Sequence, residues 1–229
     1  MSAAKGMVIH MKKLYIILSL YFLLNGAIGQ KGGINSQTGI MELNSGEIRL
    51  NDIYCAAGIV VGADCTLIVD GDVDAGAMFI CRGGTVNITG KLTADIVYFD
   101  SDAAKLSVRI GEVAAKYYTQ CGGTVIIDGN IVAREKNGGD GRGIINVNSA
   151  YADYGVTFLL VRGGVFARGG DIWFGMPPSD EASAASFFSV RGISICGYDF
   201  PAPREGTYMF SNGGINATGG GKVYHDEML

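Results

Sequence analysis

The feature that most constrains this chain is a five-residue phrase, Gly-x-aliphatic-x-Ala, that recurs along it. The copies begin at Gly71, Gly90, Gly111, Gly129, Gly163 and Gly213. The first four glycines are separated by steps of 19, 21 and 18 residues. A nearly fixed step of about 20 residues is typical of repeat architectures, in which each copy forms one structural unit.

Within each copy, apolar residues alternate with polar ones. Val69, Val73 and Ala75 share one parity, as do Ile88 and Leu92, and this period of two predicts short strands with one buried face. Short strands at this step, without helical spacers, predict an all-β fold: a single-stranded parallel β-solenoid (β-helix) with about 19–20 residues per coil. An antiparallel sandwich also has short strands and Gly-rich turns, but we do not expect it to repeat one phrase at one phase.

The segment before the repeats has the pattern of a Sec-type signal peptide. Lys12 and Lys13 precede an apolar run over residues 14–24, and the small residues Ala27 and Gly29 follow it. We therefore expect cleavage before Gln30, a secreted or cell-envelope location, and no membrane span in the mature form. The run is short for a span, and a retained N-terminal anchor is the alternative.

This pattern divides the chain into three parts. We expect an N-terminal extension plus signal peptide at 1–29, a polar lead-in arm at 30–45, and the β-solenoid at 46–229. Three stretches interrupt the repeat with charged, Gly-rich or Pro-containing sequence and predict projecting loops. They lie near 134–142, 177–186 and 198–206.

Composition excludes several function classes. The formal net charge is -4, so the chain has no basic surface for nucleic acid. The only histidines are His10 and His225, so the repeats have no histidine for a zinc site or a Ser-His-Asp triad. We therefore assign no catalytic residue, no cofactor and no metal.

One copy of the repeat, Ile88-Thr-Gly-Lys-Leu-Thr-Ala-Asp-Ile-Val-Tyr-Phe99, resembles the bactofilins. The resemblance covers roughly residues 65–134. It implies a bacterial β-solenoid that polymerises end to end as a scaffold, without nucleotide. The leader and the loops of the second half differ from the bactofilin pattern. A signal peptide followed by a solenoid also resembles the secreted adhesin-type β-solenoids of bacterial envelopes.

Two groups of residues are candidates for a binding surface. Asp70, Asp72 and Asp74 occupy alternate positions, so we expect them on one strand face, where carboxylates could offer ligands to a hard cation. Lys91 at the matching place in the next copy disfavours a metal, and a solvated face is the favoured interpretation. In the aromatic-rich second half, Trp173, Tyr198 and Tyr208 are candidate contacts for cell-surface carbohydrate or protein.

The five cysteines, at 55, 65, 81, 121 and 196, form no CxxC motif. A secreted protein can oxidise cysteines, but the spacing assigns no pairing. Cys65 and Cys81 lie in strand contexts, where a buried cysteine acts as a small apolar residue.

These observations favour a structural or adhesive solenoid, a stiff scaffold or binding surface that associates with itself end to end or laterally. The alternative is a polysaccharide lyase or hydrolase with carboxylates in a groove bordered by the loops. Its candidate residues are Asp95, Asp100, Asp102, Arg109 and Lys116. Convergence of the loops around carboxylates favours the enzyme, and scattered loops favour the scaffold.

Overall fold

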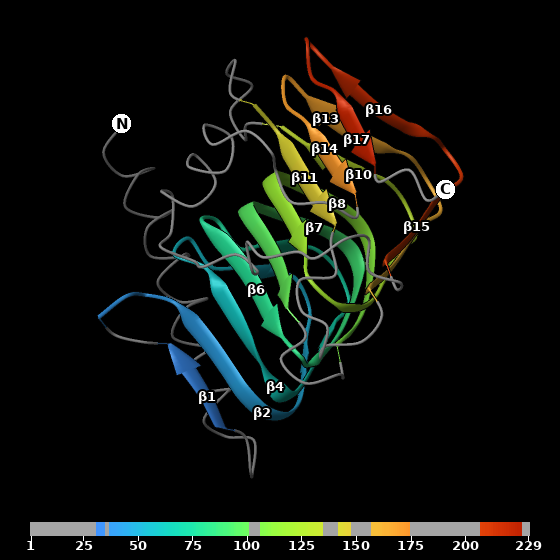
Figure 1. The fold of residues 1–229 in the computed structure, drawn as a ribbon. Helices are drawn as coiled ribbons and strands as arrows, with labels where there is room; N and C mark the ends of the chain where they lie inside the picture. Colours follow the sequence, from blue (N-terminus) through green and yellow to red (C-terminus); the bar gives the residue numbers. More distant parts are fainter. Residues whose placement is uncertain are drawn as a thin grey trace, which may run out of the picture.

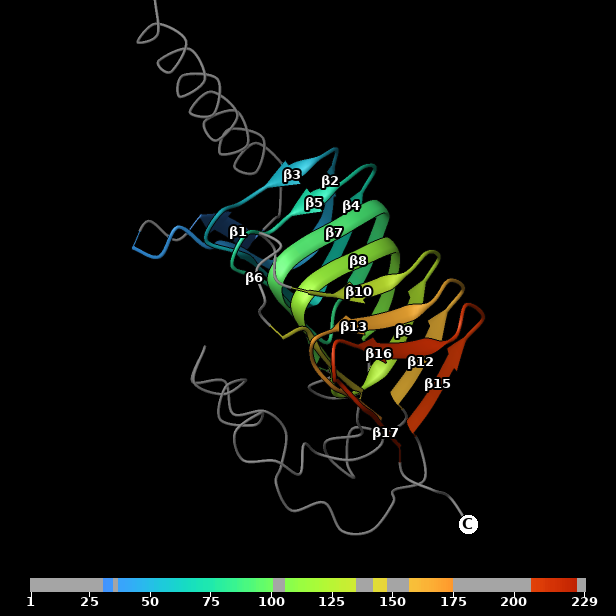
Figure 2. The same cartoon turned by 90° about the horizontal axis from the view of Figure 1, so that it is seen from above.

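The computed structural model describes residues 31–34, 37–100, 106–134, 142–147, 157–174 and 207–225. The fold prediction is confirmed: the described residues form an all-β parallel solenoid without a helix. Successive strands pair with strands of the previous coil in three separate stacks, here called faces A, B and C (Figures 1 and 2).

The strands of each face follow in stacking order. Face A contains residues 45–50 of β2 (Met41–Leu50), 64–69 of β4 (Ile59–Val69), 85–88 of β7 (Thr85–Asp100), 107–110 of β8 (Ser107–Gln120), β9 (Gly123–Ile127), β12 (Thr157–Val161) and β15 (Thr207–Ser211). Face B contains β3 (Ile53–Tyr54), β5 (Val73–Asp74), 91–94 of β7, 112–115 of β8, β10 (Ile131–Ala133), β13 (Val165–Arg168) and β16 (Ile215–Thr218).

Face C contains residues 41–43 of β2, 59–61 of β4, β6 (Met78–Arg82), 96–100 of β7, 117–120 of β8, β11 (Ile144–Val147), β14 (Ile172–Phe174) and β17 (Val223–His225). The first strand, β1 (Lys31–Ile34), is different because it pairs with β2 in the antiparallel sense. Strand β1 therefore covers the edge of residues 41–45 of β2 at the N-terminal end of the stack.

The repeated phrase forms face B and the corner that precedes it. Its aliphatic residues make one column of parallel pairs, running Val73, Leu92, Val113, Ile131, Val165 and Ile215. The glycines stack at the corner between faces A and B, where Gly90 N donates to Gly71 O at 2.9 Å. A Cβ atom on Gly90 would lie 2.5 Å from that same oxygen, so successive coils approach too closely there for any side chain.

Apolar residues of one parity on every face fill the interior. Near the corner that follows face C, the rings of Phe79, Phe99 and Tyr118 pack edge to face, with centroids 6.3 and 5.8 Å apart. In the next rung the partner of Phe99 is Gln120, which is buried. Its side-chain amide donates to the carbonyl oxygens of Gly122 at 3.3 Å and Gly123 at 3.1 Å, so a buried polar group is satisfied inside the turn.

The stack departs from the predicted boundaries in two places. It begins at Met41, inside the predicted lead-in arm at 30–45, because residues 41–43 pair in parallel with 59–61. At the other end, β12 pairs directly with β15, β13 with β16 and β14 with β17. No coil fits between these two rungs. The rest of the predicted solenoid between these rungs, residues 175–206, lies outside the described residues.

The three predicted loops also lie almost entirely outside the described residues, but the strands on either side show where they leave the stack. Residues 135–141 connect β10 on face B to β11 on face C. The two later stretches, 177–186 and 198–206, fall in one connection that leaves β14 on face C and enters β15 on face A. The loops therefore attach at two different corners of the solenoid.

Candidate functional site

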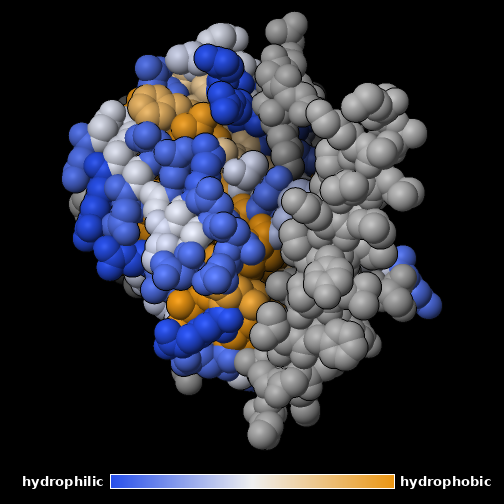
Figure 3. All heavy atoms as spheres, turned by 180° about the vertical axis from the view of Figure 1, so that it is seen from behind, coloured by the Kyte–Doolittle hydropathy of each residue, from blue (hydrophilic) through white to orange (hydrophobic). Residues whose placement is uncertain are grey.

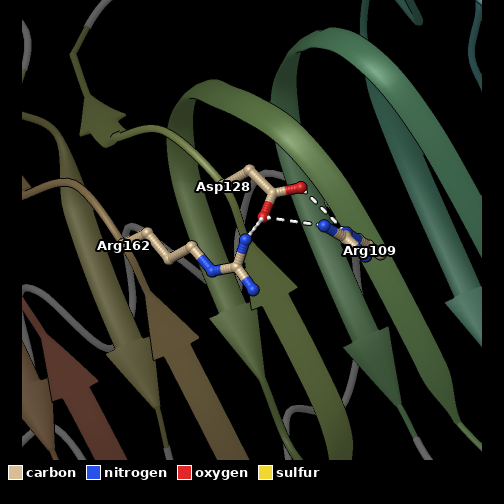
Figure 4. Close-up of polar contacts among 3 residues, drawn as sticks. All are labelled: Arg109, Asp128 and Arg162. Carbon is tan, nitrogen blue, oxygen red and sulfur yellow. Dashed lines mark hydrogen bonds and ion pairs between the residues drawn. The ribbon is translucent and has the colours of Figure 1, made fainter.

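The most conspicuous polar cluster lies on the outside of face A and links three successive rungs (Figure 4). Asp128 follows β9 and lies between Arg109 of β8 and Arg162, which follows β12. Arg109 Nε donates to Asp128 Oδ2 at 2.8 Å and Arg109 Nη2 donates to Asp128 Oδ1 at 3.2 Å. Arg162 Nη1 lies 2.9 Å from Asp128 Oδ1.

This cluster is built to stay ionised. The hydrogen bonds from Arg109, together with the charges of Arg109 and Arg162, hold the pKa of Asp128 below its ordinary value. The same bond raises the pKa of Arg109. A carboxylate with two guanidinium partners and a lowered pKa is poorly suited to act as a general acid or base near neutral pH. Its geometry fits an ion-pair ladder that joins neighbouring coils.

The three aspartates predicted to share a strand face have structural partners instead. Asp70 Oδ1 accepts a hydrogen bond from Thr89 Oγ1 at 3.2 Å, and Asp72 Oδ1 accepts one from Lys91 N at 2.7 Å. Asp74 Oδ1 accepts one from Gly76 N at 3.0 Å. Only Asp74 lies in a strand, because the chain turns from face A to face B at residues 70–72. The carboxylate of Asp74 therefore stabilises a turn, and those of Asp70 and Asp72 form hydrogen bonds to the next coil.

The residues considered for polysaccharide chemistry are not brought together. Arg109 lies on face A, and Asp100 ends the part of β7 that belongs to face C. Asp95 and Lys116 occupy neighbouring rungs at the corner between faces B and C. Asp102 lies outside the described residues. Because the described candidates point from separate sides of the solenoid, they do not flank one bond as paired catalytic carboxylates must.

Two shallow hollows open on the described surface. One, of about 180 Å³, is lined by Lys91, Thr93, Ala94, Ala114, Ala115 and Arg134. The other, of about 290 Å³, is lined by Arg142, Ile144, Asp171, Lys222 and the glycines 169, 170 and 219–221. Asp171 is the one carboxylate in either lining, and its Oδ1 accepts a hydrogen bond from Lys222 N at 2.8 Å. Neither hollow is therefore lined by a pair of carboxylates.

Cysteine and metal chemistry can be examined over the described residues only. Among them, Cys55, Cys65, Cys81 and Cys121 are buried free thiols, and no group of three or more His, Cys, Asp or Glu side chains is placed to hold a metal ion. Burial raises the pKa of Cys65 to about 11 and that of Cys81 to about 12. These two thiols behave as small apolar core residues.

The three aromatic residues predicted as binding contacts differ in what the structure describes of them. Trp173 is 0 % exposed, so it does not offer an open contact for carbohydrate or protein. Its place in β14 puts it on the outer side of face C, next to Asn146 of the neighbouring strand. Tyr208 pairs with Phe158 in the β12–β15 register, and only its backbone is described. Tyr198 lies outside the described residues.

Trp173 belongs to a second apolar cluster that sequence reasoning missed, here called the outer C surface. Its buried members are Met78, Ile80, Ile96, Tyr98, Tyr117, Cys121, Ile144 and Trp173. On face A the outward positions are occupied by exposed residues such as Asn87 and Arg109. The side seen from behind in Figure 3 is accordingly largely hydrophilic, with smaller hydrophobic areas. Figure 1 looks onto face C.

The sequence carries a signal for this surface. Residues 78–81 read Met-Phe-Ile-Cys and residues 96–99 read Ile-Val-Tyr-Phe, and every one of these side chains is buried. Unbroken apolar runs are typical of strands buried on both faces, whereas alternation marks strands buried on one face. The runs therefore distinguish face C from faces A and B.

The two ends of the stack differ in how they close the core. At the N-terminal end Met41 and Ile48 are each 1 % exposed. At the C-terminal end Ile215 is 40 % exposed and Val223 is 39 % exposed. Their counterparts one rung earlier, Val165 and Ile172, are 0 % exposed. Within the described residues, no strand pairs with the outer edges of β15, β16 and β17.

No protein-family model, no curated protein and no solved structure matches this chain. The described residues include no helix long and apolar enough to cross a membrane. The fold is compatible with a structural or a binding role.

Proposed function

We propose that this protein is a stiff structural solenoid of the cell exterior or envelope, and that two copies associate through their C-terminal rungs. The observation that carries the proposal is the open end of the core, where Ile215 and Val223 are exposed while their counterparts in the preceding rung are buried. Exposed apolar residues beside unpaired strand edges favour pairing with another chain.

The geometry of the edge supports strand pairing. Val165 N donates to Gly214 O, and Gly169 N donates to Thr218 O, both towards the body of the stack. Backbone groups alternate in direction along a strand, so the N–H and C=O groups of Ile215 and Ala217 are directed towards the open edge. A second chain can satisfy these groups in the same way as the next coil of the solenoid.

The difference between the two ends determines the kind of assembly. Strand β1 lies antiparallel on the N-terminal edge of β2, from Lys31 opposite Ser45 to Ile34 opposite Met41. Strand β1 occupies this part of the N-terminal edge, and Met41 and Ile48 at this end are buried, so we expect the C-terminal end of one copy to meet the C-terminal end of another. Contact between identical ends is isologous and closes with two-fold symmetry. The expected product is a pair with antiparallel strands at its junction.

The exterior location follows from the leader-like sequence at residues 11–29. A rod made of two solenoids offers long flat sides, and cell-surface carbohydrate or protein is the partner class that suits this location. The location is tested by N-terminal sequencing of the protein purified from its host. A mature chain that starts at Gln30 supports export, and an intact N-terminus contradicts it.

The pairing is tested by negative-stain electron microscopy of the chain that starts at Gln30. We expect rods twice the length of one solenoid, with two-fold related halves. Long filaments of uniform width would contradict the closed pair and favour end-to-end polymers. Single solenoids at every concentration would contradict self-association through either end.

A further inference from the structure

The outer C surface is buried, although no described strand packs over it. The described strands contact their neighbours within the stack, and Figures 1 and 2 show no described element over the outer side of face C. Yet Trp173, Ile144 and Ile96 on this side are 0, 5 and 3 % exposed. This burial is present in one chain alone, so a second copy is not needed to explain it.

Two polar atoms on the same surface show what kind of cover it requires. Thr119 and Asn146 are Cα partners in neighbouring strands of face C, and both are buried. Within the described residues, Thr119 Oγ1 and Asn146 Oδ1 have no hydrogen-bond partner. Buried polar atoms left unsatisfied cost free energy. A cover with both apolar side chains and hydrogen-bonding groups, such as a polypeptide segment, fits this surface.

We infer that residues 175–206 of the same chain cover the outer C surface. This segment starts directly after Phe174, on face C itself, and returns to the stack at Thr207. It adds no rung, because β12 pairs directly with β15. It contains the apolar residues Phe187, Phe188, Val190, Ile193, Ile195, Tyr198 and Phe200.

The length of the segment is sufficient. Between Phe174 and Thr207 lie 207 - 174 - 1 = 32 residues, which reach about 105 Å when fully extended. The surface runs across β6, β7, β8, β11 and β14, and four strand spacings measure roughly 19 Å. The segment can therefore cross the surface and come back several times over.

The other connections fit less well. Residues 148–156 also leave from face C, but they number 157 - 147 - 1 = 9 and include Asn148, Ser149 and Asp153. Residues 135–141 leave from the end of face B and are charged and Gly-rich. Of these three connections, 175–206 has both the length and the apolar content that the cover requires. This inference is independent of the pairing proposed above.

The experiment uses Trp173, the only tryptophan of the chain, as a reporter. Residues 177–204 are deleted, so that 175, 176, 205 and 206 link β14 to β15. This link is longer than the turn at residues 121–122 that joins β8 to β9. We expect red-shifted emission and a several-fold increase in acrylamide quenching, while circular dichroism keeps the β signature. Deletion of residues 150–154 is the matched control and should leave Trp173 shielded.

A folded 177–204 deletion with Trp173 still shielded would overturn the inference. Exposure of Trp173 in the 150–154 deletion alone would also overturn it, because the shorter connection would then be the cover. If the longer deletion does not fold, the full-length variant Phe187→Ser with Phe188→Ser replaces it. Increased quenching in that variant supports the inference, and unchanged quenching contradicts it.

Discussion

At the scale of single residues, the fold depends on a column of glycines that stack with almost no space between coils. The phrase glycines meet one another through their backbones, with Gly163 N donating to Gly129 O at 2.9 Å and Gly213 N to Gly163 O at 2.8 Å. The next residues differ freely in charge, as Asp72, Lys91 and Glu112 show. The repeated glycine is therefore explained by the close approach of the backbones of neighbouring coils, and it does not need a catalytic or binding role.

The substitution Gly111→Ala tests this account. A Cβ atom there would lie 2.4 Å from Thr89 O and 2.5 Å from Gly90 O, both backbone atoms that cannot move independently. Overpacking of this kind costs about 1–3 kcal/mol of unfolding free energy. Urea denaturation should show this loss. The control Asn87→Ala, at an exposed position on face A, should change the free energy of unfolding by less than about 0.5 kcal/mol. Equal stability of G111A and the wild type would contradict the close approach.

The ion-pair ladder at Asp128 makes a prediction about pH and salt. Its pKa is lower in the folded chain than in the unfolded chain. Its contribution to stability is therefore fully present above the unfolded value of about 4 and is lost as pH falls through the lower folded value. Thermal unfolding of Asp128→Asn should show a small loss of stability at pH 7. That loss should shrink in high salt and below pH 4, because exposed ion pairs are screened. A difference that persists in both conditions would show that the ions are not its source.

At the scale of the structural element, face C differs from the other two faces because its strands are buried on both sides. The inner side holds the rings of Phe79, Phe99 and Tyr118, and burial raises the pKa of the Tyr118 hydroxyl. Cys81 lies in the same strand as Phe79. An element without a solvated side is expected to open less readily than the edges of the stack.

The buried thiols report on this rigidity. Because burial raises the pKa of Cys65 to about 11 and that of Cys81 to about 12, both are neutral at pH 8, and the thiol form is a poor nucleophile. Iodoacetamide at pH 8 should leave both unmodified in the native chain and alkylate both in urea. Peptide mass spectrometry distinguishes them from the other cysteines. Modification of Cys81 in the native chain would contradict a tightly packed face C.

The elements were predictable from the sequence where the repeat is regular. The glycine phrase has one steric cause, so it correctly identifies face B and its register. The outer C surface was not predicted, because the strands were predicted from alternation of apolar and polar residues, and the unbroken apolar runs at 78–81 and 96–99 do not alternate. Trp173 was expected to be an open contact, but a side chain's exposure depends on what covers its face. The aspartates at 70, 72 and 74 were expected on one strand, but the corner at Gly71, with φ of 153°, separates them.

At the scale of the whole molecule, the two ends of the described solenoid differ: a strand covers part of the N-terminal edge, whereas no described strand pairs with the C-terminal edge. Strand β1 lies on β2 at the N-terminal end, while β15, β16 and β17 form the last described rung (Figure 2). Among the described residues, the candidates for polysaccharide chemistry lie on different sides of the solenoid, and the two hollows lack paired carboxylates. The difference between the two ends is the basis of the proposed structural role.

The most direct test of the proposed pairing is sedimentation equilibrium of the chain from Gln30 over a wide concentration range. We expect a reversible monomer–dimer equilibrium. Ile215→Lys should shift it strongly to monomer, because a charge at the open end of the core opposes strand pairing. Asn216→Lys, on the outer side of the same strand, adds the same charge and should leave the equilibrium unchanged. A wild-type chain that stays monomeric, or an I215K variant that still dimerises like the wild type, would contradict the pairing of C-terminal rungs.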